Sequence, residues 1–335
     1  MIPLDPLVVA LGDPAGIGPE VTAKAWMACR DLEDCPPFLA VGDARSIEAV
    51  WSGPVARIYD PSEAARIFPT ALPIIQVEDA GDIRPGHADF EGARCSLDSL
   101  ELAVGLARSG AVSGLVTGPV SKSQLYAVGF THPGQTEFVA ERCGIARENV
   151  VMMLAGPGLK VVPITTHMPL ADVPKALTVD LIVSRSIVTA RGLQRNFGIE
   201  RPHLAFAGFN PHAGEDGKLG HEEIDIVGPA MEILRAEGIH VTGPYAADTM
   251  FHPRARELYD VAMCLYHDQA LIPIKTLYFD DGVNISLGLP IVRTSPDHGT
   301  AFNIAGHDLA HPGAMIAAIR MAAAAARMRL ERALA

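Results

Sequence analysis

The chain alternates short apolar runs with longer segments whose apolar residues recur at helical spacing. Continuous apolar or β-branched runs, typical of buried strands, occur at 38–41, 114–117, 150–154, 160–165, 203–207 and 261–266. The first unit has an apolar run at 6–11, a turn at 12–18 and then a helix from Pro19, because proline suits the first helical turn. This alternation predicts βαβ units, an α/β fold and a largely parallel sheet.

Two further segments add detail to that fold. Apolar runs flank Gly156-Pro-Gly158, which predicts a hairpin over 151–163 and therefore a mixed sheet. The Ala-rich stretch 312–335 predicts a closing helix, with arginines near its end where cations favour the helix dipole. At roughly 150 residues per domain, 335 residues predict two lobes. We place the first lobe at 1–128 plus 300–335, and the second, with the metal and substrate residues, at 129–299.

Composition and charge exclude several classes of protein. Hydrophobic residues make up 49% of the chain and charged residues 20%, the opposite of a disordered composition. The net charge of −12 repels polyanions, so we expect no nucleic-acid partner. The longest stretch without Asp, Glu, Lys or Arg, 123–136, is too short to span a membrane, and the first residues lack a basic start, so we expect a cytoplasmic protein. Five cysteines without a C-x-x-C pair are expected to be reduced and mostly buried.

Three histidines each follow the end of an apolar run, at His167, His212 and His267. In α/β sheets ligands bind outside the carboxyl ends of strands, so these side chains can converge although 45 and 55 residues separate them. Three imidazoles would leave open positions on a divalent metal, as a catalytic site needs. The alternative is that each histidine only hydrogen-bonds a neighbouring loop.

Downstream, Lys275, Asn284 and Arg293 are embedded in apolar sequence. A buried cation must be paired or held for a ligand, which favours an anionic phosphate or carboxylate substrate. Ion pairs with Asp280 or Asp281 are the structural alternative. Thr136 is a further candidate ligand contact, or else a helix cap.

Two loops are candidates for nucleotide or anion binding. The segment 297–306, Asp-His-Gly-Thr-Ala-Phe-Asn-Ile-Ala-Gly, has small residues and backbone donors that allow a nucleotide to approach closely, or it is only a loop before a helix. The 12–18 turn lacks the G-x-G-x-x-G fingerprint, and its expected role is helix entry with amides available to an anion.

Several motifs together resemble the 4-hydroxythreonine-4-phosphate dehydrogenase family, over nearly the whole chain and in family order. They are Gly12-Asp-Pro-Ala-Gly-Ile-Gly-Pro-Glu20, Gly118-Pro-Val-Ser-Lys122, Gln135-Thr-Glu-Phe138, Asn210-Pro-His-Ala-Gly214, Gly243-Pro-Tyr-Ala-Ala-Asp248, Tyr266-His-Asp-Gln269 and Asp297-His-Gly-Thr-Ala301. The resemblance implies an isocitrate/isopropylmalate-dehydrogenase-like fold, with a cleft between two α/β lobes. It also implies a homodimeric oxidoreductase of pyridoxine and pyridoxal 5′-phosphate biosynthesis that uses NAD or NADP and zinc, magnesium or cobalt.

The resemblance also assigns roles to individual residues. His167, His212 and His267 become metal ligands shared between the subunits and, with Lys275, the catalytic residues. Substrate contacts are Gln135, Thr136, Lys275, Asn284 and Arg293, and the cofactor contacts are His298, Gly299, Thr300 and Asn303. The implied reaction oxidises 4-hydroxythreonine 4-phosphate and then releases carbon dioxide to give 3-amino-2-oxopropyl phosphate, with Lys275 transferring a proton.

Two positions depart from the family pattern. Gln135 replaces the usual histidine and cannot carry a proton at neutral pH, which leaves threonate or erythronate 4-phosphate as alternative substrates. Asn303 replaces a common aspartate and leaves the choice between NAD and NADP open. An alternative from another class is a metal-dependent hydrolase, which would need no nucleotide.

Overall fold

The structure is a computed structural model that describes residues 4–32 and 35–334. Its described residues form two compact units, one from residues 4–32, 35–144 and 289–334 and the other from residues 145–288. The sequence placed the lobe boundaries after residues 128 and 299. The cleft expected between the lobes stays a prediction.

The first unit contains a parallel sheet in the order β3-β4-β2-β1-β5-β12. Its strands are β1 (Leu7–Ala10), β2 (Phe38–Gly42), β3 (Val55–Arg57), β4 (Leu72–Gln76), β5 (Gly114–Thr117) and β12 (Arg293–Pro296). All residues of β1, β2 and β5 are buried. Helices cover both faces of this sheet, and so the central strands are continuous apolar runs rather than alternating ones.

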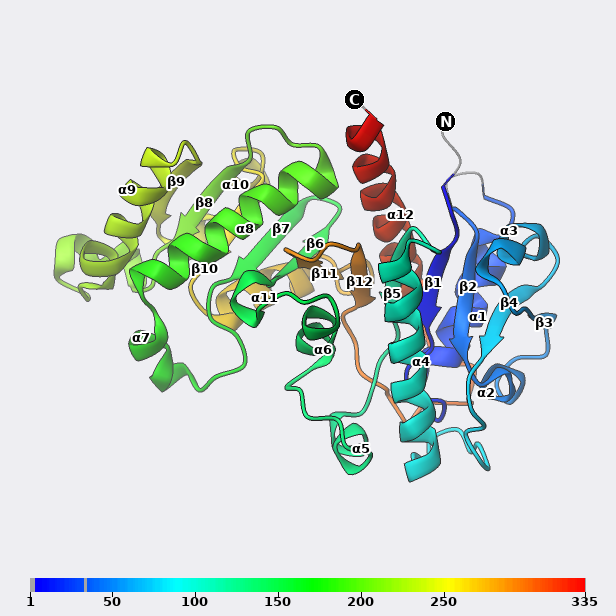
Figure 1. The fold of residues 1–335 in the computed structure, drawn as a ribbon. Coiled ribbons are helices and arrows are strands. Elements are labelled where there is room, and N and C mark those ends of the chain that lie inside the picture. Colours follow the sequence, from blue (N-terminus) through cyan, green and yellow to red (C-terminus); the bar gives the residue numbers. More distant parts are fainter. Residues whose placement is uncertain (1–3, 33–34, 335) are drawn as a thin grey trace. The chain divides into compact units, whose positions relative to one another are not determined.

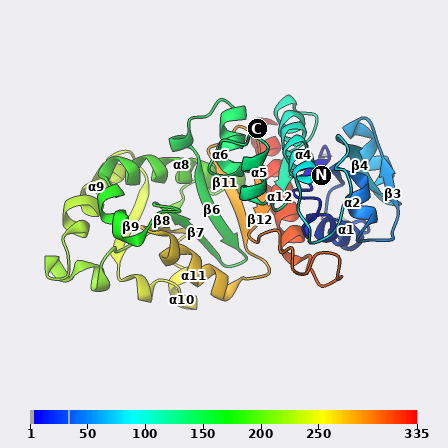
Figure 2. The same ribbon diagram turned by 90° about the horizontal axis from the view of Figure 1, so that it is seen from below.

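The helices of the first unit lie on the two faces of its sheet, α4 on one face and α1 and α12 on the other (Figures 1 and 2). They are α1 (Gly18–Cys29), α2 (Ala44–Glu48), η1 (Pro61–Glu63), α3 (Ala64–Ile67), α4 (Phe90–Ser109), α5 (Lys122–Ala127), α6 (Gln135–Arg142) and α12 (Gly313–Leu334). The α4 helix begins where the Asp89 carboxylate accepts the Gly92 N–H at 2.8 Å, a normal N-cap.

The second unit contains a mixed sheet in the order β11-β6-β7-β10-β8-β9. Its strands are β6 (Val151–Gly156), β7 (Leu159–Pro163), β8 (His203–Ala207), β9 (His240–Tyr245), β10 (Val261–Cys264) and β11 (Val283–Leu287). β6 is antiparallel to both β7 and β11, while β7, β10, β8 and β9 are mutually parallel. The predicted hairpin and the largely parallel mixed sheet are therefore confirmed.

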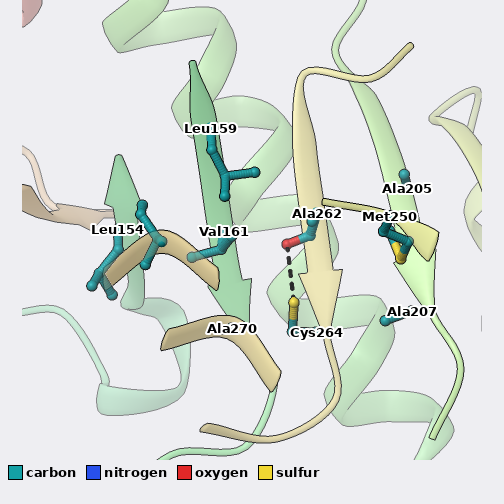
Figure 3. Close-up of a cluster of buried hydrophobic side chains, with 10 residues drawn as sticks. Leu154, Leu159, Val161, Ala205, Ala207, Met250, Ala262, Cys264 and Ala270 are labelled. Atoms are coloured by element: carbon teal, nitrogen blue, oxygen red, sulfur yellow. Dashed lines mark hydrogen bonds between the residues drawn. The ribbon is translucent and has the colours of Figure 1, made fainter. Parts of the chain in front are cut away.

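Helices α8 and α9 lie on one face of the second sheet, and α10 and α11 on the other (Figure 2). The helical elements are η2 (Arg147–Asn149), η3 (Leu170–Asp172), α7 (Val173–Ala176), α8 (Val179–Phe197), η4 (Pro211–Gly217), the π-helical η5 (Glu223–Val227), α9 (Gly228–Ala236), η6 (Ala247–Thr249), α10 (Pro253–Arg256) and α11 (His267–Leu277). Figure 3 shows the core beneath α11, where Val161 of β7, Ala262 of β10 and Ala205 of β8 lie on neighbouring strands.

The predicted strands and helices are present with small changes at their ends. The strand expected at 160–165 ends at Pro163 and the one expected at 261–266 ends at Cys264. The closing helix runs from Gly313 to Leu334, and residue 335 lies outside the described residues. All five cysteines are free thiols, four of them buried. Within the described ranges, every helix is too short or too polar to cross a membrane.

Candidate active site

The three candidate metal ligands follow three strands that are neighbours in the second sheet. β10 pairs in parallel with β7 on one side and with β8 on the other, so their carboxyl ends meet at one edge. His167 lies four residues after β7, His267 begins α11 just after β10, and His212 lies in η4 after β8. The sheet order therefore brings together segments that are far apart in the sequence.

His167 and His267 lie side by side at this edge. Their ring centroids are 5.5 Å apart, with an interplanar angle of 47°. Nδ1 of His267 is 2.7 Å from Oδ1 of Asp268, and because a carboxylate oxygen accepts, this contact orients the ring with Nδ1 toward Asp268 and Nε2 as the other ring nitrogen. Both rings line a pocket of about 370 Å³, together with Tyr266 and Asp268.

This pair fits a divalent metal. Nitrogens about 2.0–2.1 Å from one zinc ion in a tetrahedral arrangement would place two ring centroids roughly 5 Å apart. The observed 5.5 Å is close to that value. A carboxylate on the far nitrogen of a metal-binding histidine is a common second partner, and Asp268 supplies one.

His212 lies in a strained loop at the end of the neighbouring strand. Five consecutive residues, 212–216, have positive φ, from 45° to 82°, although only Gly214 tolerates this without cost. The buried Glu223 carboxylate holds the loop through two hydrogen bonds from Asn210. It accepts one from the Asn210 backbone N–H at 2.7 Å and one from the Asn210 side-chain amide at 2.9 Å. His167 also has a positive φ of 43°. Strain of this kind at non-glycine residues marks segments that are fixed for a function.

The structure brings two of the three histidines into contact within one chain. His212 makes no ring contact with His167 or His267 among the described residues. Over the same part of the chain, no group of three His, Cys, Asp or Glu side chains is arranged to hold a metal. His212 is exposed on the surface of the second unit.

The first unit contains a buried arginine that the sequence predicted as a substrate contact. Arg293, at the start of β12, is 3% exposed. Its Nη2 donates to the Thr117 hydroxyl at 2.7 Å, and its Nη1 donates to the Thr136 hydroxyl at 3.2 Å. Burial lowers the pKa of Arg293 to about 10, and the nearby Glu137 carboxylate opposes that change. The guanidinium therefore stays charged at neutral pH and is held in a fixed orientation.

Gln135 and Thr136 begin α6 beside this arginine. Gly134 is the N-cap residue and provides no side-chain cap, so the capping role considered for Thr136 is wrong. The amide of Gln135 donates to the Gly118 carbonyl at 3.1 Å. First-turn N–H groups of a helix have no partner within the helix, and with Arg293 they suit an anion.

Lys275 and Asn284 lie in the second unit, on α11 and β11. Both are half-buried. Oδ1 of Asn284 is buried and has no hydrogen-bond partner within residues 4–32 and 35–334. A buried acceptor without a donor is unusual in a folded protein, and a bound ligand with a hydroxyl or amine would explain it.

The candidate nucleotide loop packs against the first turn of the chain. Ile17 N–H donates to the Thr300 carbonyl at 3.0 Å. A Cβ on Gly16 would lie 3.1 Å from that same oxygen, so glycine permits the close approach. His298, Gly299 and Asn303 lie on the same loop, with Asn303 exposed.

Asp13, in the turn at 12–18, is a buried carboxylate that the sequence analysis did not single out. It is 2% exposed and accepts the Ala15 N–H at 3.0 Å. Burial raises its pKa to about 6, the Ala15 hydrogen bond opposes this, and the Asp89 charge adds to it. Thr117 and Asp268 were missed as well. Asp13 and Asp268 each lie within a quoted motif, which was the available signal, whereas Thr117 lies outside them.

Comparisons with known proteins identify the family to which this chain belongs. The family model "Pyridoxal phosphate biosynthetic protein PdxA" matches residues 33–322. A 4-hydroxythreonine-4-phosphate dehydrogenase of Zymomonas mobilis is 57% identical over 97% of both chains, and one of Erythrobacter litoralis is 53% identical over 98% of this chain and 99% of its own. The crystal structure of 4-hydroxythreonine-4-phosphate dehydrogenase from Klebsiella pneumoniae has a TM-score of 0.86 and 37% identity, covering 96% of this chain and 98% of that one.

The relatives named above are dehydrogenases, so this two-unit α/β protein is an oxidoreductase. The match over most of the chain gives the family. The chain belongs to the PdxA family of pyridoxal phosphate biosynthetic proteins. The family predicted from the motifs is thus confirmed, and none of the three names above is that of a hydrolase.

Proposed function

We propose that this chain oxidises 4-hydroxythreonine 4-phosphate with NAD or NADP in the cytoplasm, and that carbon dioxide then leaves the product. A hydride leaves the carbon of the secondary alcohol for the nicotinamide, and a proton leaves its oxygen. The bond to the carboxylate then breaks, carbon dioxide departs, and a proton replaces it to give 3-amino-2-oxopropyl phosphate. High identity to relatives named for this substrate supports the proposal.

His167, His212 and His267 would hold a divalent ion, zinc, magnesium or cobalt. The two rings 5.5 Å apart support the first part of this ligand set, and the Asp268 contact leaves a nitrogen of His267 available. When bound, such an ion supplies a positive charge that lowers the pKa of the reacting hydroxyl and stabilises the developing negative charge.

His212 would complete the ligand set across a homodimer. Its neighbouring strand position and its exposed ring support a contribution to the partner subunit's site. The strained 212–216 segment supports the same role, because the ring is presented on a fixed loop.

The substrate's anionic groups would bind near Arg293, Thr136 and Gln135. Arg293 is already oriented by two hydroxyls, so little conformational freedom is lost when an anion binds. Gln135 contributes a neutral amide at this position. Asn284 would accept a hydrogen bond from the substrate through its buried Oδ1, and Lys275 would transfer the proton at its Nζ.

The nicotinamide nucleotide would bind against His298, Gly299, Thr300 and Asn303. Support comes from the packing of this loop on the 12–18 turn, where glycine allows close approach of the backbone. Asn303 is uncharged and so does not by itself repel a 2′-phosphate, which is compatible with NADP as well as NAD.

The contact between His167 and His267 at adjacent strand ends carries this proposal, because it provides a centre for the chemistry. The test follows the absorbance of reduced nicotinamide with 4-hydroxythreonine 4-phosphate, threonate 4-phosphate and erythronate 4-phosphate, each with and without a chelator. We expect the highest kcat/KM with the first compound and loss of turnover in chelator. A higher kcat/KM with threonate or erythronate 4-phosphate would make that compound the substrate instead. Full turnover without metal would contradict the metal site, and absence of saturable NAD(P) binding would favour a hydrolase.

A further inference from the structure

A side-chain amide is inserted between two parallel strands just below the candidate metal site. β10 and β8 pair in register up to Met263 and Phe206, and Leu265 and Gly208 lie two residues further along the two segments. There the side chain of Gln269, in α11, bridges the two backbone segments. Its Oε1 accepts the Leu265 N–H at 2.7 Å, and its Nε2 donates to the Gly208 carbonyl at 2.7 Å.

The same Leu265 peptide is also held from the other side. The Thr165 hydroxyl donates to the Leu265 carbonyl at 2.7 Å, and the Thr165 N–H approaches the same oxygen at 3.3 Å. Thr165 and Gln269 are both buried, 3% and 8% exposed. One chain of hydrogen bonds thus links the ends of β7, β10 and β8.

These contacts lie next to the candidate ligands. Thr165 precedes His167 by two residues, Leu265 precedes His267 by two, and Gly208 precedes His212 by four. A shift of any strand end relative to its neighbour would therefore change the position of the imidazole that follows it.

We infer that Gln269 and Thr165 are positioning residues for the metal centre: they fix the spacing of the three strand ends that carry His167, His267 and His212. This inference rests on the proposed function, since it concerns the same histidines. Gln269 acts like an additional peptide group just after β10 and β8, because its amide hydrogen-bonds to the backbone that follows each strand.

The chemistry explains why glutamine occupies this position. A primary amide has both a carbonyl acceptor and an N–H donor, and here both are used. An ionised carboxylate lacks the donor, and an apolar chain of the same length lacks both groups. Methionine is similar in length and flexibility, so Gln269→Met removes the two bonds with little change in volume.

The test titrates the metal-free protein with Co²⁺ and records its visible absorption spectrum. We expect Gln269→Met to weaken Co²⁺ binding about 10–100-fold and to change the spectrum, as loss of a group that orients metal ligands typically does. Thr165→Val should also weaken Co²⁺ binding and change the spectrum, but by less, because the Thr165 N–H still reaches the Leu265 carbonyl. Thr165→Ser keeps the hydroxyl and should bind Co²⁺ as the wild type does.

Thr189→Val is the matched control. It removes a buried hydroxyl in the same unit, where Thr189 donates to the Arg185 carbonyl within α8. It should leave Co²⁺ affinity and spectrum unchanged. Equal weakening by Thr189→Val would show a general loss of stability and overturn the inference, as would wild-type affinity and spectrum in folded Gln269→Met. If Gln269→Met does not fold, the Thr165 pair decides, and equal behaviour of Thr165→Val and Thr165→Ser overturns it.

Two further variants separate this inference from the proposed function. His167→Ala and His267→Ala should each abolish tight Co²⁺ binding. If they retain it, the metal site itself is wrong. If they lose it while Gln269→Met retains it, only the positioning role is wrong.

Discussion

A buried guanidinium is costly unless its N–H groups find acceptors, and the two terminal nitrogens of Arg293 both do so. Thr117 and Thr136 accept from two of its nitrogens, and burial lowers its pKa only to about 10. Arg293 is thus charged and oriented before a ligand arrives. The sequence indicated Arg293 because a cation stood in apolar surroundings. Thr117 gave no such signal, because a threonine at a strand end is common.

Asp13 gives a pH-dependent prediction. Its pKa of about 6 in the folded protein lies above the ordinary 3.8, so the folded state holds a proton more tightly than the unfolded state. The stability this provides is fully present below about pH 4 and is lost as the pH rises through about 6. Asp13→Asn keeps the acceptor for Ala15 without the charge. We expect it to be more stable than the wild type above pH 6, by up to about 3 kcal/mol.

Urea unfolding of both proteins across this pH range measures the effect. The difference in free energy of unfolding should grow between about pH 4 and pH 6 and stay level above. A difference independent of pH would show that Asp13 ionises normally.

Among the elements, the 212–216 segment is the one whose backbone conformation is least expected. Left-handed backbone costs an L-residue about 1–2 kcal/mol, and Glu215, with φ 45°, is exposed. We expect Glu215→Gly to raise the free energy of unfolding by about 0.5–1 kcal/mol, after the greater entropy of glycine in the unfolded chain is included. Glu215→Ala is the control and should give no gain, because alanine has the same strain. The test compares the denaturant midpoints of the wild type, Glu215→Gly and Glu215→Ala. A lower midpoint for Glu215→Gly than for the wild type would contradict the strained loop.

The elements also show which part of the fold a sequence can predict. Strands such as β1 and β10 are continuous apolar runs, because helices cover both faces of the sheet, and the hydrophobic pattern alone indicated them. β12 was missed because it begins with a buried arginine, Arg293, and β9 because Gly243 and Pro244 interrupt it. Their polar or irregular residues are stabilised by contacts with distant segments, which local pattern does not contain.

The candidate site follows the same rule. Strand-end histidines were visible in the sequence, since each comes after an apolar run. The order β7-β10-β8, which places them at one edge, follows from chain topology. Gln269 lay within a quoted motif, but its role depends on the Leu265 and Gly208 peptides meeting across that order.

At the scale of the whole molecule, the geometry of one chain leads to the proposal of a homodimer with a shared metal centre. Within the described part of one chain, His167 and His267 meet while His212 does not join them. The proposed centre therefore draws on two subunits. The net charge of −12 opposes the approach of an anion, so the proposed anionic substrate would depend on a local cation such as Arg293.

Mixing two inactive variants tests most directly whether the metal centre is shared between two subunits. His167→Ala and His212→Ala should each be inactive as homodimers, because every site lacks one ligand. In a mixed dimer of the two, one site combines an intact His167 with an intact His212 from the other subunit. After subunit exchange at equal concentrations, we predict recovery of about a quarter of wild-type turnover, since half of the dimers are mixed and each has one intact site. No recovery, with mixed dimers shown to form, would contradict a metal centre shared between subunits.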